Sequence, residues 1–266
     1  DRSPSRGLGD VYKRQTLHWV SKTGAPEAAQ GYDDSTWKVA SSTTERTPWQ
    51  KPTLGGAALD SNLLGFYEGS VWYRAHFTAD TTRTLKLNAN GGQGAPKPNG
   101  VDPAFMQVWI NGTYAGAYRA VGNTTSIELP SSIKAGDPVV LSVVVHNLGQ
   151  NLDWSDNGLS RQSRGLNSAS LPAKGAVTWR VRGALSTEQT GDTARTMYNN
   201  GDLYGERAGW YLPGMPDKDW TAATTMTVDH PGIRWYRSTF NLSVPTGQDT
   251  TFQVVVKPSG NGKGPG

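Results

Sequence analysis

Two close pairs of acidic residues, Asp153 with Asp156 and Glu188 with Asp192, are spaced closely enough to act together as general acid and base. Retaining hydrolysis of a glycosidic bond uses two carboxyl groups about 5 to 5.5 Å apart, one as nucleophile and one as acid and base. Close acids in loops are, however, ordinarily solvated or paired with arginine. We therefore expect no catalysis by these pairs. A serine nucleophile is no better supported, because the chain contains no Gly-x-Ser-x-Gly turn.

Metal and thiolate chemistry also lack support in the sequence. The chain has no cysteine, and its four histidines show no metal-ligand spacing. Asp33 and Asp34 are candidates for a calcium site, but Asp34 also begins an Asp-x-x-Trp sequence that ends at Trp37. We interpret this sequence as a turn in which the aspartate caps backbone amides before the tryptophan packs. We expect no metal and no cofactor.

The charge distribution argues against a nucleic-acid or membrane partner. The formal charge is +4, and the first fifteen positions supply +2 of it through four basic and two acidic residues. The rest of the chain is only slightly basic. No apolar run approaches about 18 residues, and no signal peptide opens the chain. Residues 1–15 are polar and without hydrophobic periodicity, and they resemble a translated sequencing-adapter scar, so we expect a disordered or non-native tail.

A repeated motif organises the rest of the chain. The run from Gly69 to Phe77 and the run from Gly232 to Phe240 both read Gly-x-x-Trp-Tyr-Arg-x-x-Phe. Each follows an Asp-x-x-Trp sequence, which ends at Trp37 in the first case and at Trp220 in the second. The two runs are 163 residues apart, which is the size of a whole domain. We therefore expect two copies of one module, with the second cut off in mid-fold.

Short strands without intervening helices are the expected elements. Residues 71–78 alternate, with Val71, Tyr73, Ala75 and Phe77 on one face and Trp72, Arg74 and His76 on the other. Further strands are predicted at residues 16–20, 83–89, 139–145 and 176–182, and a hairpin at residues 105–116 around Asn111-Gly112. This pattern is typical of an all-β, jelly-roll β-sandwich. Most of the ten tryptophans should fill cores, and Arg74 should stack on an aromatic ring or bond an acid.

The predicted boundaries follow from the repeat. Residues 1–15 form the tail, residues 16–185 the first sandwich, residues 186–208 a junction, and residues 209–266 the beginning of a truncated second sandwich.

The junction carries the most specific resemblance. Together with the Trp-Tyr-Arg strands and the end of the strand at His146-Asn147-Leu148-Gly149, it resembles the pair of C-terminal jelly rolls of family 35 β-galactosidases. The matching junction residues are Glu188, Asp192, Arg195, Asn199, Gly201, Leu203, Tyr204, Glu206, Arg207, Gly209 and Trp210. Asn200, Asp202 and Tyr211 depart from the family pattern, as does Gln162-Ser163 before Arg164-Gly165.

The resemblance implies a galactose-binding-like sandwich region from an enzyme that hydrolyses terminal β-D-galactosyl residues. In that family both catalytic glutamates lie on a TIM barrel, which this chain lacks, so the chain alone should be inactive and its main partner should be that barrel. The parent enzyme would be secreted or otherwise extracytoplasmic. A free-standing carbohydrate-binding module that takes a galactoside or another glycan is the alternative, because tryptophan-rich sandwiches often handle sugars.

Six residues are candidates for barrel docking, for an interdomain contact or for carbohydrate binding: Trp154, Arg164, Tyr204, Glu206, Arg207 and Trp210. Glu206 and Arg207 are adjacent, so in an extended segment their side chains would point to opposite sides and each would need a partner elsewhere.

Overall fold

The computed structural model describes residues 17–41, 57–67, 69–92, 104–147, 163–184, 202–224, 232–241 and 246–247. The chain divides into two compact units. The larger unit comprises Thr23–Met215 and His230–Ile233, and the smaller unit comprises Asp1–Lys22, Pro216–Asp229 and Arg234–Gly266.

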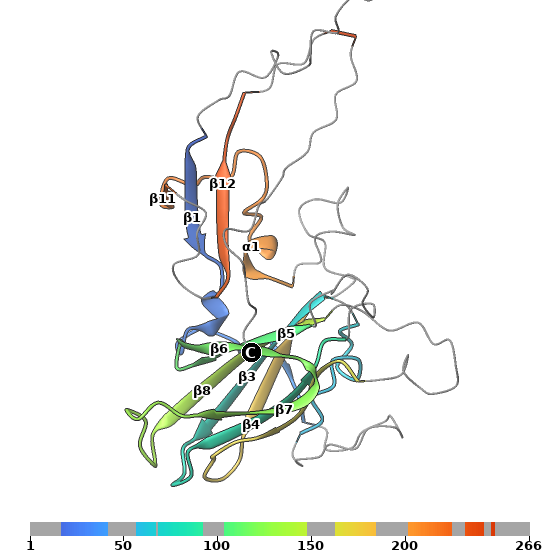
Figure 1. Cartoon of the computed structure of the whole chain (residues 1–266), viewed down its shortest axis with the longest axis vertical. Coiled ribbons are helices and arrows are strands. Elements are labelled where there is room, and N and C mark those ends of the chain that lie inside the picture. Colours follow the sequence, from blue (N-terminus) through green and yellow to red (C-terminus); the bar gives the residue numbers. More distant parts are fainter. Residues whose placement is uncertain are drawn as a thin grey trace, which may run out of the picture. The chain divides into compact units, whose positions relative to one another are not determined.

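The larger unit is a sandwich of two antiparallel sheets (Figure 1). One sheet has six strands in the order β2-β10-β3-β8-β5-β6, and the other has three in the order β7-β4-β9. The six strands are β2 (Lys38–Val39), β10 (Thr178–Arg182), β3 (Gly69–Thr78), β8 (Pro138–Asn147), β5 (Phe105–Ile110) and β6 (Thr113–Arg119). The facing strands are β7 (Val121–Glu128), β4 (Thr84–Asn90) and β9 (Gly165–Ser170). The prediction of an all-β sandwich is confirmed.

The alternation in β3 separates two hydrophobic clusters. Val71, Tyr73, Ala75 and Phe77 lie in the main core between the two sheets. Trp72 lies in a second cluster on the opposite face, with Trp37, Trp109 and Val144 among its members. The six-stranded sheet is therefore covered on both faces around β3, which explains why its neighbour β8 is apolar at every position from Val139 to Val145 except Ser142.

The predicted hairpin forms at the Asn-Gly pair. β5 and β6 are joined by Asn111 and Gly112, which have φ angles of 49° and 81°. A type I′ turn requires positive φ at both central positions, and Asn-Gly provides them at least cost. The register of the hairpin shifts between Val108 and Trp109, where β5 and β6 contain an irregularity.

Three strands of the sandwich were not predicted from the sequence. β7 has a single buried residue, Ile127, and β9 has a single large apolar residue, Leu166, among small and polar residues. The two-residue strand β2 forms only because it pairs with β10. Pairing with a neighbour, rather than local hydrophobic pattern, makes these segments strands.

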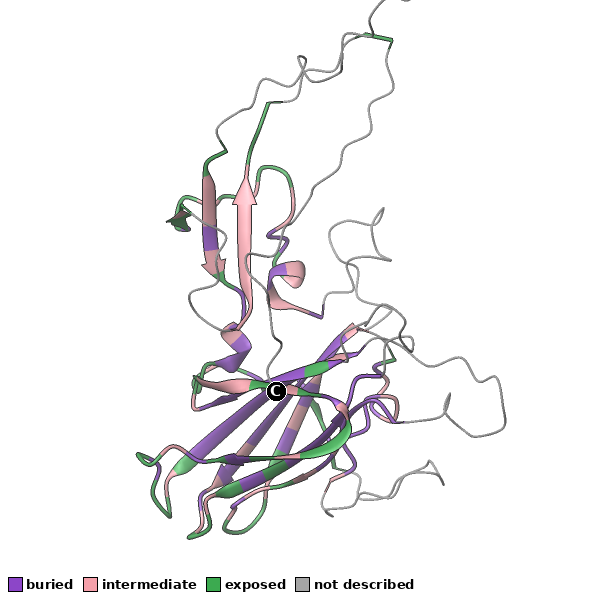
Figure 2. Cartoon of the chain, in the orientation of Figure 1, coloured by how far each residue is buried: buried purple, intermediate pink, exposed green. Residues whose placement is uncertain are grey.

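The smaller unit contains a three-stranded sheet in the order β11-β1-β12. Its strands are β11 (Thr221–Ala223), β1 (Trp19–Thr23) and β12 (Arg234–Ser238). β1 overlaps the strand predicted at residues 16–20, and it is the central strand of this sheet. Every residue of β12 is only partly buried, whereas β3 is buried over most of its length (Figure 2).

Candidate functional site

Four of the six candidate residues lie on or beside one helical turn of the larger unit. Helix α1 (Tyr204–Arg207) contains Tyr204, Glu206 and Arg207, and Trp210 follows it. These four residues, together with Glu27, Ser70, His146 and Asp202, form what we call the junction cluster. The expectation of an extended segment at Glu206 and Arg207 is wrong, because the segment is helical.

Arg207 ties the junction to the N-terminal part of the larger unit. One of its terminal nitrogens, Nη2, donates to Oε1 of Glu27, which lies in the 3-10 turn η2 (Pro26–Ala28). The other, Nη1, donates to the main-chain carbonyl of Asp202 over 2.8 Å. The Glu27 side chain is completely buried. Burial raises the pKa of Glu27, and the nearby charge of Arg207 opposes that rise.

Glu206 caps its own helix. Its Oε2 accepts a hydrogen bond from the Leu203 amide over 3.1 Å, so its partner is local rather than distant. Burial, followed by the hydrogen bond with Asp202 and the charge of Asp202, raises the pKa of Glu206 to about 8. Burial and the neighbouring carboxylate of Asp202 thus favour the protonated form of Glu206.

Asp202 connects the junction to the end of β3. Its Oδ2 accepts a hydrogen bond from the Ser70 amide, and the Ser70 hydroxyl lies 2.9 Å from Nδ1 of His146. Burial lowers the pKa of His146, and the negative charge of Asp202 opposes that effect. The His146 ring also stacks against Phe105, with ring centroids 4.3 Å apart.

The two aromatic residues of the junction pack on each other. The rings of Tyr204 and Trp210 meet edge to face with centroids 5.5 Å apart. Trp210 is buried, and Tyr204 is partly buried. A sugar ring stacks on an open aromatic face, so Trp210 in this position supports packing of the junction rather than a sugar platform.

Arg164 belongs to a different part of the larger unit. Its side chain is buried, and burial lowers its pKa while the charge of Asp60 opposes that shift. Its main-chain carbonyl accepts a hydrogen bond from the Ser61 amide over 2.8 Å. Arg164 thus connects the loop that leads into β9 with the turn after Asp60. Trp154, the sixth candidate, lies outside the described residues.

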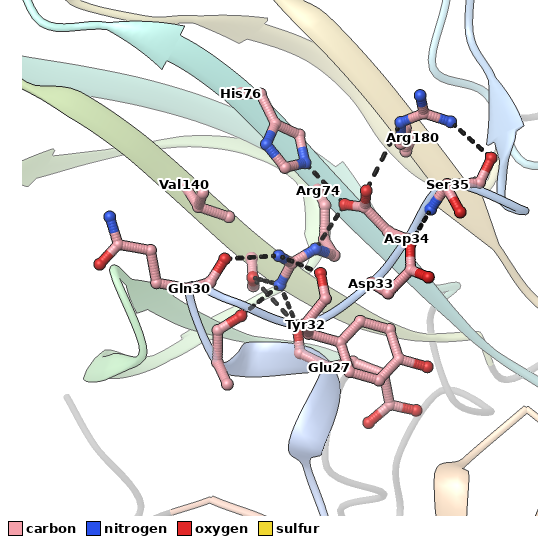
Figure 3. Close-up of polar contacts among 12 residues, drawn as sticks. Glu27, Gln30, Tyr32, Asp33, Asp34, Ser35, Arg74, His76, Val140 and Arg180 are labelled. Carbon is pink, nitrogen blue, oxygen red and sulfur yellow. Dashed lines mark hydrogen bonds and ion pairs between the residues drawn. The ribbon is translucent and has the colours of Figure 1, made fainter.

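A second polar network surrounds Arg74, which bonds an acid and lies beside an aromatic ring, as predicted (Figure 3). Its Nε donates to Oδ2 of Asp34 over 2.6 Å, and its guanidinium lies 5.6 Å from the centre of the Tyr32 ring. The other guanidinium nitrogens donate to the carbonyls of Glu27, Ala29, Gln30 and Tyr32 and to the Ser142 hydroxyl. Arg74 thereby fastens the segment from η2 to Asp34 onto the six-stranded sheet.

Asp34 has a role that the sequence interpretation missed. Its carboxylate is shared among two arginines and a histidine: Arg74, His76, whose Nε2 is 2.6 Å away, and Arg180 at 3.5 Å. Burial opposes ionisation of Asp34, but hydrogen bonds from His76 and Arg74 outweigh it, so its pKa is lowered. The amide cap predicted for the Asp34 side chain is therefore wrong, and Asp33 caps the Ser35 amide instead. The turn itself is present, because the Trp37 amide donates to the Asp34 carbonyl over 2.9 Å.

The acidic side chains of both networks are bound by neighbouring residues of the larger unit. Hydrolysis of a glycosidic bond needs two carboxyl groups that flank the bond and can reach it. In the junction cluster, Glu206 and Asp202 accept backbone hydrogen bonds and contact each other, and Glu27 is bound by Arg207. Within the described ranges, no group of three or more histidine or acidic side chains is arranged to hold a metal ion.

Sequence reasoning missed Glu27, Ser70 and His146 as members of the junction cluster. Asp202 did carry a signal, because it departs from the family pattern at a position where a carboxylate is now seen to be buried. No local pattern marks Glu27, because its partner Arg207 lies 180 residues away.

The strands and their pairing define an all-β sandwich protein, and comparison with known families gives a narrower answer. The profile of the family described as the β-galactosidase second all-beta domain matches residues 32–151 and 204–265. The chain belongs to this family of β-galactosidase domains.

Two relatives of similar sequence are fungal β-galactosidases that are much longer than this chain. β-Galactosidase A of a Penicillium species is 31% identical over 247 residues, which cover 88% of this chain and 23% of that protein. A β-galactosidase of Aspergillus niger is 30% identical over 239 residues, which cover 86% of this chain and 23% of that protein. The chain thus spans less than a quarter of the length of these relatives.

Solved structures give a weaker likeness. A glycosyl hydrolase family 2 member from Bacteroides cellulosilyticus aligns with a TM-score of 0.34 and 16% identity, over 62% of this chain and 20% of that one. This level of similarity supports no inference about function. Among the residues that the structure describes, no helix has the length and apolarity to cross a membrane.

Proposed function

We propose that this chain is the non-catalytic β-sandwich region of a β-galactosidase that hydrolyses terminal β-D-galactosyl residues. The catalytic carboxyl groups would lie on a TIM barrel of the same parent polypeptide. The sequence alignment supports a separate catalytic barrel, because 88% of this chain aligns with only 23% of a β-galactosidase. The matching family is also described as a second all-β domain. The engaged state of the junction carboxyl groups is consistent with a scaffold.

The junction cluster is proposed to hold residues 202–210 on the first sandwich rather than to bind sugar. The side chains of Arg207, Asp202 and Glu206 form hydrogen bonds with partners within the larger unit. Trp154 is retained as a candidate contact to the barrel or to a glycan.

The domain division also remains a proposal: a first sandwich at residues 16–185, a junction at 186–208 and a second module from residue 209. The exception is β1, which lies within the first of these ranges but pairs with β11 and β12 in the smaller unit. Two observations support it. The family profile matches two separate stretches, and each stretch contains one Trp-Tyr-Arg strand, β3 or β12. An extracellular location of the parent enzyme is proposed on the family resemblance, and recovery of the full-length enzyme from culture medium would test it.

Three measurements on residues 1–266 test the proposed function. With a chromogenic β-galactoside we expect no turnover above that of buffer, and turnover would refute the assignment of catalysis to a separate barrel. On an immobilised galactoside we expect no retention, whereas retention would favour the free-standing carbohydrate-binding module. With the separately expressed barrel we expect co-purification, and its absence would contradict the scaffold role.

Single variants separate docking from sugar binding. Trp154→Ala should weaken co-purification with the barrel if Trp154 is a docking residue. Arg119→Ala, which removes an exposed cation at the end of β6, is the matched surface control and should leave co-purification unchanged.

A further inference from the structure

The three strands of the smaller unit repeat the arrangement at one edge of the six-stranded sheet. At that edge β10 lies between β2 and β3, and in the smaller unit β1 lies between β11 and β12. β2 and β11 each directly follow an Asp-x-x-Trp sequence, and β3 and β12 each contain Trp-Tyr-Arg. By position, β1 is therefore the counterpart of β10.

The register of pairing gives the same correspondence residue by residue. Val181 of β10 lies opposite Lys38, and Ser21 of β1 lies opposite Thr221. Lys38 and Thr221 are equivalent, because each directly follows the tryptophan of its Asp-x-x-Trp sequence. Both pairs of strands are antiparallel. Ser21 thus takes the place of Val181 in the second module.

With Ser21 equivalent to Val181, the residues two positions earlier in β1 and in β10 are both tryptophans. Trp19 then corresponds to Trp179, and both are followed by three further strand residues or more. Trp179 is 4% exposed in the main core of the sandwich. Trp19 is partly buried in the smaller unit. β1 and β10 therefore agree in strand order, in register and in the type of residue at this position. An arbitrary segment paired with β11 would not be expected to show all three.

The contact with β12 obeys the same register. If β1 paired with β12 as β10 pairs with β3, Gly24 would lie opposite Ile233. The Gly24 amide does donate to the Ile233 carbonyl, over 2.7 Å. At the other end of β1, the Ser238 hydroxyl donates to the His18 carbonyl over 3.0 Å.

The ion pair between the arginine of Trp-Tyr-Arg and the aspartate of Asp-x-x-Trp is also repeated. Arg237 of β12 donates through Nε to Oδ2 of Asp217 over 3.2 Å, as Arg74 of β3 does to Asp34 over 2.6 Å. Arg237 lies 5.9 Å from the ring centre of the buried Trp220, the counterpart of Trp37. In the second module, β11 and β12 therefore flank β1 in the way that β2 and β3 flank β10 in the first module.

We propose that β11 and β12 form an acceptor site for an antiparallel strand, and that Trp19–Thr23 of the same chain occupies it in the place that β10 occupies in the first module. An added strand satisfies the backbone N–H and C=O groups of both flanking strands, and its side chains cover the sheet. The N-terminal segment and the second module then fold as one unit, although most of the first sandwich lies between them in the sequence.

An engineered disulfide tests the occupant. The chain has no cysteine, and Val20 lies directly opposite Ala222, so the variant Val20→Cys/Ala222→Cys should form an intrachain disulfide under mild oxidation. The matched control is Val20→Cys/Thr221→Cys, in which a shift of one residue puts the second thiol on the other face of the sheet. Equal oxidation of both variants would overturn the proposal. A disulfide between two chains would also overturn it, because a second copy would then supply the strand.

Hydrogen exchange tests the energetic role of β1. Proline at Ser21 removes a backbone donor in the middle of β1, so Ser21→Pro should lower the protection of β12 amides by at least about tenfold and leave β3 amides unchanged. An excess of a peptide of residues 17–24 should restore that protection. Lys22→Ala, which removes an exposed ion pair to Asp219, is the control that should leave β12 protected. Unchanged protection in Ser21→Pro, or no protection of β12 in the unmodified chain, would overturn the proposal.

Discussion

Replacing Arg74 by methionine should strongly destabilise the first sandwich. The Arg74 side chain is completely buried, and its partner Asp34 is 8% exposed at a distance of 2.6 Å. Methionine retains the apolar length of the side chain, but it leaves a buried carboxylate without its closest cation. Breaking a buried ion pair by removing one partner costs about 3 to 5 kcal/mol. For a domain of this size that loss lowers the melting temperature by roughly 6 to 20 °C.

The second module supplies a matched control for this experiment. Arg237 and Asp217 repeat the pair in β12, but their side chains are 17% and 37% exposed and the nitrogen and oxygen are 3.2 Å apart. Solvent screens such a pair, so Arg237→Met should cost no more than about 1 kcal/mol. Urea unfolding followed by hydrogen exchange would report the free energy of unfolding for β3 and β12 separately.

Two results would refute the reasoning. One is a loss of less than about 1 kcal/mol in Arg74→Met, and the other is an equal loss in Arg74→Met and Arg237→Met. A double variant adds a check on the mechanism. Arg74→Met combined with Asp34→Asn should lose less stability than the sum of the two single variants, because the neutral amide no longer needs the cation.

Three further changes test other parts of the structure. Because its pKa is raised from 4.5 to about 8, Glu206 stabilises the fold at low pH, so the free energy of unfolding should fall as pH rises through this range and fall less in Glu206→Gln. Gly165→Ala should lower the free energy of unfolding, measured with urea, more than Gly175→Ala, because both glycines have positive φ but only a Cβ at Gly165 would clash with the Tyr73 hydroxyl. Arg207→Ala should lower the free energy of unfolding by about 3 to 5 kcal/mol, whereas Arg119→Ala should lower it by less than about 0.5 kcal/mol. Similar losses in the two variants would contradict a stabilising ion pair between Arg207 and Glu27.

The local hydrophobic pattern was sufficient to predict a strand where the segment buries one or both of its faces. The alternation in β3 and the apolar run in β8 predicted two strands that pair along their whole length. The Asn-Gly pair predicted a hairpin because few other residues adopt its two positive φ angles. β7 and β9 were missed because each buries only one large apolar residue, Ile127 or Leu166, and their other residues are held in strands by pairing with the two sides of β4.

The junction cluster was predicted only in part. Its helix-borne members were identified by resemblance, but their conformation and partners were not. Glu206 and Arg207 were expected to reach out from an extended segment, and one helical turn instead directs Glu206 back to the Leu203 amide. Burial also raises the pKa of Glu206, and this shift cannot be read from residue type.

The amino-acid sequence by itself determined the class of fold, the duplication of the Trp-Tyr-Arg motif and the turn chemistry, because these depend on the spacing of residues along a short stretch of chain. Only the tertiary structure decided which charges meet and which strand lies beside which. Glu27 meets Arg207, and β1 lies between β11 and β12, across sequence separations at which no local periodicity constrains the pairing. Such contacts are selected by burial and by the need to satisfy every buried polar group, and both are properties of the folded chain.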